Sequence, residues 1–585
     1  MQPQRQNPQN ISFLGTAAMT GGLVWLGDYL GAPIINGEIQ PLPAAVWLAA
    51  GLGGLTLTIQ SLELLARASN WKRMHTATGK GGTGGWAKKK HFKRELSRKK
   101  QGPFWGISAD KSRTPLFIPY DSNAVTFGPA GSGKGETSVV PNCLSILDSK
   151  VIPDFKDAEL SCMLKGELER RGERVIILNA PRKHTEIIGE GETYNPIDIV
   201  TDDLNRPGGL RDVMDDLREM TMQLRPEPAS GESENTYFRN GARGRIADSI
   251  LFESMIDEYD ATLSSVSLLI EDRDRLDNTA RWVAGIDLKG KPHPGGPMPI
   301  ERTDWAKMHP PQDVAEFTQL VRARARNLVS LMDRPDNRTF ESFITDAQQA
   351  LAPFAFGRFA PAMGRSTFRM EDLKNGDKAT SLFIIADESR PETSNAYIGL
   401  NQWCCMTALK RHTNKHKDVY FICDEANNYK VNGLIELLTW GRAYKLHVHI
   451  FCQNIAAFRK IYGQDGADTL ISETEIKQFL PGQRLPEMLE LMSKQLLGEQ
   501  SVMAPNMGQG GQQTVFQDTL SESSRALMTL DELRRSDLGL LFVRRCRPIA
   551  FEPVSYAEVK PWRDGQVGIN PFYGKPYRKP VKLRL

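Results

Sequence analysis

A glycine-rich segment that ends in lysine carries the clearest chemistry in this sequence. Residues Gly128–Glu136 read Gly-Pro-Ala-Gly-Ser-Gly-Lys-Gly-Glu and follow the apolar run Asn123–Phe127. Glycines at such a turn let successive backbone N–H groups point inward and bind phosphate oxygens. Lys134 supplies a mobile charge for the β- and γ-phosphates of a nucleotide. We therefore predict a P-loop that binds ATP through Gly128, Pro129, Ala130, Gly131, Ser132, Gly133, Lys134, Gly135 and Glu136.

The residue after the lysine departs from the usual P-loop pattern. A Ser or Thr at this position normally offers its hydroxyl to Mg²⁺, whereas this chain has Gly135. Thr137, Ser132 and a water molecule are the alternatives for that place. The sequence thus predicts a magnesium-dependent site but leaves one ligand of the ion open.

Two acids end a second apolar run. Asp424 and Glu425 come directly after Val419–Cys423. In a P-loop enzyme an aspartate at this place orients the magnesium shell, and the glutamate polarises the attacking water. A plain strand that ends in a solvated acidic turn is the alternative, but its coincidence with an independent P-loop favours hydrolysis. We assign Asp424 to the metal and Glu425 to catalysis.

Two further polar residues follow in the same part of the chain. Gln453 directly follows the apolar run His447–Cys452, where multi-stranded P-loop motors have a sensor for the γ-phosphate. Arg442 lies between the acids and this run, and a neighbouring subunit could use it as an arginine finger. The alternatives are a loop glutamine and a surface arginine. Both residues are predicted to be catalytic.

The elements that must position these residues are strands alternating with helical stretches. Short apolar runs bounded by turn residues predict buried strands, and their alternation with helices predicts an α/β fold with a parallel sheet covered on both faces. The predicted strands are Asn123–Phe127, Lys150–Asp154, Arg174–Leu178, Ser381–Ala386, Val419–Cys423, His447–Cys452, Glu475–Phe479 and Leu540–Arg544.

About two hundred residues separate the third predicted strand from the fourth. This interval contains long helical patterns, such as Arg243–Ile256 and Pro311–Met332, and few strand-like runs. It predicts an all-α domain inserted into the nucleotide-binding domain. The predicted organisation is residues 1–67, 68–102, 103–200, 201–350, 351–560 and 561–585: a transmembrane hairpin, a basic Gly/Lys linker, the first part of the nucleotide-binding domain, the insertion, the second part, and a basic C-terminal tail.

The N-terminus contains two mostly apolar segments, Ile11–Leu30 and Leu42–Ala66, each long enough to cross a bilayer as a helix. A cleaved signal peptide is the alternative for the first, but a second apolar segment follows at once. Lys and Arg are absent from residues 31–41 and frequent over residues 67–100, which predicts that both ends of the hairpin and the main domain lie in the cytoplasm.

The net charge and the cysteine content say less about the function than the motifs do. A net charge of +4 is too small to indicate a nucleic-acid-binding protein by itself. The seven cysteines form no CxxC pair, which argues against a zinc site or a disulfide framework and fits a reducing compartment. Candidate phosphate contacts are the basic run Lys88–Arg94 and the alternating arginines Arg322, Arg324 and Arg326.

Several blocks of the sequence together resemble the coupling proteins of conjugation and type IV secretion, the TraG/TraD-like ATPases. The resemblance extends from about residue 10 to residue 560 and is carried by the order and spacing of the blocks. They are the P-loop with glycine after its lysine, Asp154–Leu160 with one residue more than the family's aspartate–lysine–acid block, Tyr194–Asp198, Asp424–Asn427, Gly441–Tyr444, Gln453–Gly463 and Arg525–Leu533.

The resemblance implies a RecA-like nucleotide-binding domain, an all-α domain that meets the substrate, and a homo-oligomer, as a hexameric ring with ATP at each subunit boundary. It implies a position in the bacterial inner membrane and contacts with the inner-membrane components of the secretion machine. The implied substrate is a relaxase bound to single-stranded DNA, or a protein effector.

Two other functions stay open at this stage. One is a DNA pump of the chromosome-segregation type, which the absence of a C-terminal winged-helix pattern disfavours. The other is a membrane receptor or scaffold whose ATP site is mainly structural, which the missing P-loop hydroxyl at Gly135 leaves possible.

Overall fold

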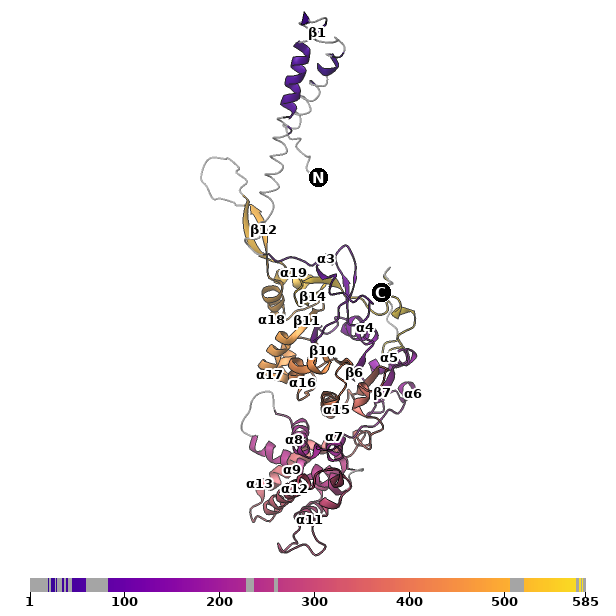
Figure 1. Cartoon of the computed structure of the whole chain (residues 1–585), viewed down its shortest axis with the longest axis vertical. Coiled ribbons are helices and arrows are strands. Elements are labelled where there is room, and N and C mark those ends of the chain that lie inside the picture. The colour runs from indigo at the N-terminus through magenta and orange to yellow at the C-terminus, as the bar shows by residue number, and fades with distance from the viewer. Residues whose placement is uncertain are drawn as a thin grey trace. The chain divides into compact units, whose positions relative to one another are not determined.

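The computed structural model (Figure 1) describes most of the chain beyond the N-terminal segment. The described residues are 83–227, 236–256, 261–505, 520–574, 578, 579 and 581, with 19, 23–26, 28, 34–35, 38–39, 45–58 and 61 near the N-terminus. The chain forms two compact units, a larger one of residues 85–497 with 528–585 and a smaller one of residues 1–84 with 498–527.

An eleven-stranded sheet organises the larger unit. Its strand order is β4-β3-β15-β14-β11-β5-β10-β9-β6-β8-β7. The bounds are β3 Phe104–Ser108, β4 Pro115–Phe117, β5 Asn123–Phe127, β6 Ser149–Asp154, β7 Arg174–Leu178, β8 Thr380–Ile385, β9 Val419–Cys423, β10 Leu446–Cys452, β11 Thr474–Phe479, β14 Gly539–Val543 and β15 Ile549–Glu552.

The eight strands expected from the apolar runs are all present, and none begins or ends more than one residue from its expected place. Seven of them, from β11 to β7 in the sheet, are parallel. The predicted parallel sheet is therefore confirmed for these seven strands. At the other end the sheet is antiparallel, because β14 is antiparallel to β11 and continues into β15, β3 and β4. Strands buried on both faces form continuous apolar runs, which explains why the parallel strands could be predicted from the sequence.

Several helices contact the strands of the sheet. Helix α17 contacts β5, β10 and β11, whereas α5 contacts β6 and β7 and α15 contacts β8. The bounds are α3 Lys89–Phe92, α4 Val140–Ser145, α5 Glu159–Arg170, α6 Thr185–Ile188, α15 Pro391–Arg411, α16 Leu434–Trp440, α17 Ile455–Glu473, α18 Pro486–Glu490 and α19 Leu530–Arg535. The seven cysteines are free and six of them are buried, as expected for inert thiols.

The described residues between β7 and β8 form helices and no strand. The helices are α7 Asp198–Leu204, α8 Val213–Leu224, α9 Thr236–Ile256, α10 Leu263–Glu271, α11 Arg273–Ala284, α12 Pro311–Met332, α13 Arg338–Ala355 and α14 Phe359–Ala362. Figure 1 shows α8, α9, α11, α12 and α13 gathered at one end of the larger unit, with the sheet at the other. The pattern expected over Pro311–Met332 matches α12 at both ends.

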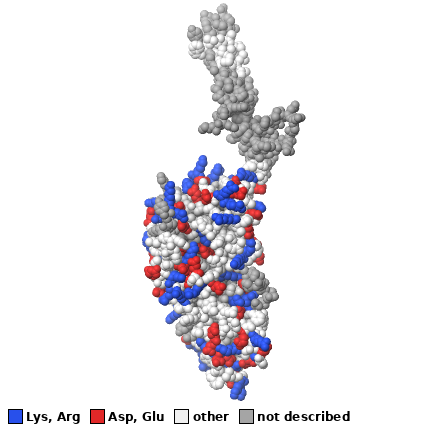
Figure 2. Space-filling view, turned by 180° about the vertical axis from the view of Figure 1, so that it is seen from behind, with Lys and Arg blue, Asp and Glu red and all other residues white. Residues whose placement is uncertain are grey.

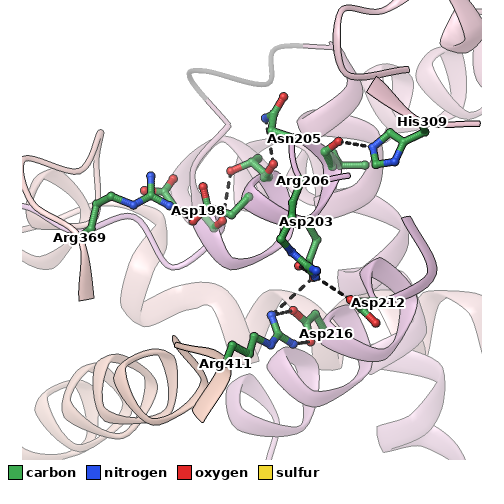
Figure 3. Close-up of polar contacts among 12 residues, drawn as sticks. Asp198, Asp203, Asn205, Arg206, Asp212, Asp216, His309, Arg369 and Arg411 are labelled. Carbon is green, nitrogen blue, oxygen red and sulfur yellow. Dashed lines mark hydrogen bonds and ion pairs between the residues drawn. The ribbon is translucent and has the colours of Figure 1, made fainter. Parts of the chain in front are cut away.

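A buried polar cluster joins these helices to α15 of the α/β part (Figure 3). Arg411, at the end of α15, donates to Asp216 of α8 at 2.5 Å. Arg206 donates to Asp203 at 2.8 Å and to Asp212 at 2.6 Å. Burial and the neighbouring Asp216 raise the pKa of Asp203. The two arginines therefore hold carboxylates together that would otherwise repel each other.

Part of the C-terminal segment expected to form a separate tail belongs to the α/β core. The Trp562 and Val567 side chains are 4% and 2% exposed and belong to the same apolar cluster as Phe104 and Phe551. The basic linker is also partly packed, since Phe92 is fully buried in that cluster.

The smaller unit contains a described antiparallel hairpin, β12 Glu499–Pro505 with β13 Leu520–Ala526, and the short pair β1 Ile34–Ile35 with β2 Glu38–Ile39. Residues 45–58 are helical. Much of the two expected membrane spans lies outside the described residues. Within the part that the structure describes, no helix combines the length and the apolar character that crossing a bilayer requires.

Candidate nucleotide site

Three adjacent parallel strands bring the expected site residues to one edge of the sheet. Strand β10 pairs with β5 on one side and β9 on the other, with Cys452 opposite Phe127 and Ile450 opposite Cys423. The residues that follow these strands are Gly128, Asp424 and Gln453. They therefore lie together at the carboxyl edge, where open α/β sheets bind their ligands.

The P-loop turns sharply between β5 and a helix. Gly131 and Gly133 have φ angles of 79° and 75°, a conformation that other residues adopt only with strain. After Lys134 the chain enters one π-helical stretch, η1 (Gly135–Val139), which continues as α4. The first N–H groups of a helix have no intrahelical partner, so this turn offers donors to an anion.

Lys134 is held by the first of the two acids. Its Nζ lies 2.8 Å from Asp424 Oδ1, and only 12% and 15% of the two side chains are exposed. Burial opposes the charged lysine, but the neighbouring Asp424, with a smaller contribution from Glu425, more than offsets it, so the pKa of Lys134 is raised. A nucleotide that uses Lys134 must therefore compete with this ion pair.

Glu425 occupies a strained position beside it. Its φ of 51° lies in the left-handed region, which is uncommon for a residue with a Cβ. Asn428 donates to its carboxylate at 2.8 Å. Burial and the charge of Asp424 raise the pKa of Glu425, against the opposing charges of Lys134 and Lys156. A raised pKa makes this carboxylate a stronger base.

One cavity of about 390 Å³ contains the expected residues. Its wall includes every P-loop position from Gly128 to Glu136 together with Asp424, Glu425 and Gln453. The side chains that sequence reasoning did not assign to it are Val140, Lys156, Glu159, Leu160, Met163, Tyr556, Asn570 and Tyr573. Lys156 places a second ammonium group here, 3.6 Å from Glu159, and only the block at Asp154–Leu160 gave a signal for it.

The magnesium ligand missing at Gly135 has two structural candidates. The Thr137 hydroxyl donates back to the Gly133 carbonyl at 2.9 Å, which leaves the lone pairs of its oxygen for a metal. The Ser132 hydroxyl is buried and has no hydrogen-bond partner in the described structure. Among the described residues no group of three His, Cys, Asp or Glu could hold a metal alone.

Arg442 lies at the opposite edge of the sheet. It belongs to η7 (Gly441–Tyr444), which precedes β10, and its guanidinium is 3.6 Å from Asp121, which precedes β5. The side chain is 65% exposed and does not line the cavity. The structure therefore does not place Arg442 in the cavity of its own chain.

The strand–loop–helix turn, the acidic pair and the adjacent glutamine, on a large and mostly parallel sheet, define a P-loop protein with a RecA-like core. The chain belongs to the family described as type IV secretory system conjugative DNA transfer, which matches residues 70–561. The family resemblance deduced from the motifs is therefore confirmed.

Individual relatives agree with this assignment. Two Escherichia coli proteins named conjugal transfer protein TraG are each 23% identical to this chain, over 457 and 435 residues. The matches cover 74% and 71% of this chain but 65% and 61% of the relatives, so the chain spans a little less than two thirds of their length.

Solved structures of the bacterial conjugative coupling protein TrwB share the fold. The form with the ATP analogue ADPNP has a TM-score of 0.53 at 16% identity, over 81% of this chain and 93% of that one. The unbound form has a TM-score of 0.51 at 17% identity, over 80% and 91%. Another structure of TrwB contains ADP and Mg²⁺.

Proposed function

We propose that this chain is the ATP-hydrolysing coupling component of a conjugation or type IV secretion machine. It would pass a relaxase–single-stranded DNA complex, or a protein effector, into the channel. The observation that carries the hydrolytic part is the meeting of Lys134, Asp424 and Glu425 in one cavity. Family membership supports the transport part, and the ligands named for TrwB support ATP and Mg²⁺.

In this proposal each residue has one task. Backbone N–H groups of the P-loop bind phosphate oxygens, and Lys134 leaves Asp424 to pair with the β- and γ-phosphates. Glu425 takes the proton of the attacking water, which its raised pKa favours. Asp424 and the hydroxyl of Ser132 or Thr137 would hold Mg²⁺ or its waters, and the ion would supply positive charge to the phosphates. Gln453 contacts the γ-phosphate.

Hydrolysis in this proposal needs a ring. Arg442 lies away from its own cavity and is exposed, so it is available to the site of a neighbouring subunit. An arginine supplied in this way stabilises charge in the transition state. The proposed assembly is a homohexamer with ATP at each boundary, as the family resemblance implies.

The DNA contacts expected from the sequence are only partly supported by the described structure. Arg322 pairs with Glu301 at 3.2 Å, and Arg324 pairs with the buried Asp248 at 2.6 Å. Arg326 and the lysines around residue 89 remain exposed. Figure 2 shows Lys and Arg interspersed with Asp and Glu over the face in view. A path for single strands, if formed, would therefore arise from several copies of the chain around a central axis.

We also propose that residues 1–67 anchor the protein in the bacterial inner membrane as a hairpin, with the larger unit in the cytoplasm. The apolar character of Ile11–Leu30 and Leu42–Ala66 and the basic residues after them support this. Removal of residues 1–70 should release the protein from membranes without loss of nucleotide binding. Membrane association of the truncated chain would contradict the anchor.

An ATPase assay on the full chain in detergent or vesicles tests the hydrolytic proposal. The wild type should hydrolyse ATP, and single-stranded DNA should stimulate it. Lys134→Ala should lose ATP binding, whereas Lys494→Ala, an exposed lysine far along the chain, should behave as wild type. Lys134-dependent binding without any turnover would favour the structural ATP site. Stimulation by double strands alone would favour a chromosome-type pump.

A further inference from the structure

The nucleotide cavity has a second half that the P-loop chemistry does not use. One half consists of the P-loop, Asp424 and Glu425, and the other of helix α5 and the C-terminal segment, residues 555–574. The volume of about 390 Å³ suits a small-molecule ligand larger than a phosphate chain. The second half therefore has room for the part of a ligand that extends beyond the phosphates.

The C-terminal segment is fixed against the walls of the cavity. Tyr556 N–H donates to the Glu136 carbonyl at 3.1 Å, and Gly568 N–H donates to the Met163 carbonyl at 2.7 Å. A Cβ at Gly568 would lie 2.7 Å from the Cys162 carbonyl, so only glycine permits this approach. Asn570 donates to Glu159 at 2.5 Å. These contacts hold the C-terminal segment in a defined position at the cavity wall.

The exposed position of the Tyr573 ring in this wall contributes little to the stability of the fold. The backbone N–H of Tyr573 donates to Asn570 Oδ1 at 3.1 Å, which sets the turn that presents it. Tyr573 is one of the residues that line the cavity, and it is 79% exposed. A large exposed ring gains little from the fold, whereas it offers a planar surface to a planar ligand.

The position of the phosphates determines which part of a nucleotide would reach this ring. The β- and γ-phosphates belong at Lys134 and Asp424, and the phosphate chain follows the start of η1. The nucleoside then continues past Glu136, whose carbonyl accepts from Tyr556 N–H at 3.1 Å. Tyr556 and Tyr573 line the same cavity, together with Leu160 and Met163 of α5.

We propose that the C-terminal segment forms the nucleobase subsite of this ATP site, with Tyr573 as the ring on which the base stacks. The inference rests on the proposed function, because it assumes that a nucleoside triphosphate binds at the P-loop. The Asn570 amide oxygen accepts from two backbone N–H groups, and one of its two N–H bonds donates to Glu159, so a single N–H donor remains for a base. Adenine and guanine both carry ring-nitrogen acceptors, so stacking beside one donor accepts either base.

The test compares ATP, GTP and inorganic tripolyphosphate as ligands of the full chain. Stacking of a base on an aromatic side chain is worth roughly tenfold in affinity. Tyr573→Ala should weaken ATP and GTP by about that factor and leave tripolyphosphate unchanged, because tripolyphosphate has no base. Tyr573→Phe keeps the ring and should bind ATP as wild type does. Ile569→Ala, exposed on the same segment but absent from the cavity wall, is the matched control.

The outcomes separate this inference from the proposed function. ATP affinity of Tyr573→Ala within twofold of wild type, or an equal loss for tripolyphosphate, would overturn the subsite. If that happens while Lys134→Ala still abolishes ATP binding, the ATP site itself stands. Absence of ATP binding by the wild type would overturn both. A chain ending at Ile569 provides a second test. Its affinity for ATP should fall by the same factor as that of Tyr573→Ala, and its affinity for tripolyphosphate should not change.

Discussion

Replacing Asp424 with asparagine should make the protein bind metal-free ATP more tightly, although the same change abolishes hydrolysis. Asp424 Oδ1 lies 2.8 Å from Lys134 Nζ, and the pair is mostly buried. At an effective dielectric constant of about 20 its gross Coulomb attraction is about 6 kcal/mol. Rehydration of both groups and the pairing of Lys134 with phosphate offset most of this. A net gain of about 1–2 kcal/mol, or roughly five- to thirtyfold in affinity, should remain.

The assay is equilibrium binding of ATP by calorimetry, with EDTA and with excess Mg²⁺. In EDTA, Asp424→Asn should bind more tightly than wild type, because Lys134 is free and no carboxylate faces the triphosphate. Addition of Mg²⁺ should strengthen wild type more than the variant, which lacks the acid for the metal shell. Asp418→Asn, at the other end of β9, is the control. Unchanged or weaker binding of metal-free ATP by Asp424→Asn refutes the view that the ion pair restrains Lys134.

Three further predictions concern catalysis, assembly and pH. Glu425→Gln should bind ATP normally and hydrolyse it about 10²–10⁴ times more slowly, which single-turnover kinetics would measure; an unchanged rate removes Glu425 from catalysis. Arg442→Ala should bind ATP normally, lose about 10³–10⁵ in turnover, and regain activity when mixed with Lys134→Ala subunits; hetero-rings without activity would contradict a role in trans. Because Asp203 keeps its proton to a higher pH when folded, its contribution to stability falls as pH rises above about 4. Urea unfolding measures how much the free energy of unfolding falls between pH 5 and pH 8. This fall should be about 1–2 kcal/mol smaller for Asp203→Asn than for wild type, and equal falls would exclude the Asp203 carboxyl as its source.

The core of the candidate site was predictable because each part is a local pattern. Strand β9 is a five-residue apolar run followed at once by Asp424 and Glu425, and β5 precedes the P-loop in the same way. Parallel strands end at one edge of a sheet, so the order of the elements already implies that these residues meet. The position of Gln453 after β10 follows from the same rule.

Other features of the sheet and of the site depend on residues that are distant in sequence. Arg113 donates to Glu552, 439 positions away, at 2.6 Å, where β3 and β15 pair, and neither strand has a pattern that names its partner. Likewise, nothing local to Tyr573 indicates that it lines the cavity of a P-loop more than four hundred residues earlier.

The amino-acid sequence by itself determined the strand runs, the P-loop, the acidic pair and the family, because periodicity, turn chemistry and motif spacing are local properties of the chain. Only the tertiary structure decided the antiparallel end of the sheet, the pairing of Lys134 with Asp424, the internal ion pairs of Arg322 and Arg324, and the place of the C-terminal segment in the cavity wall. The physical reason is that a side chain's charge partner and burial depend on which distant segments pack beside it.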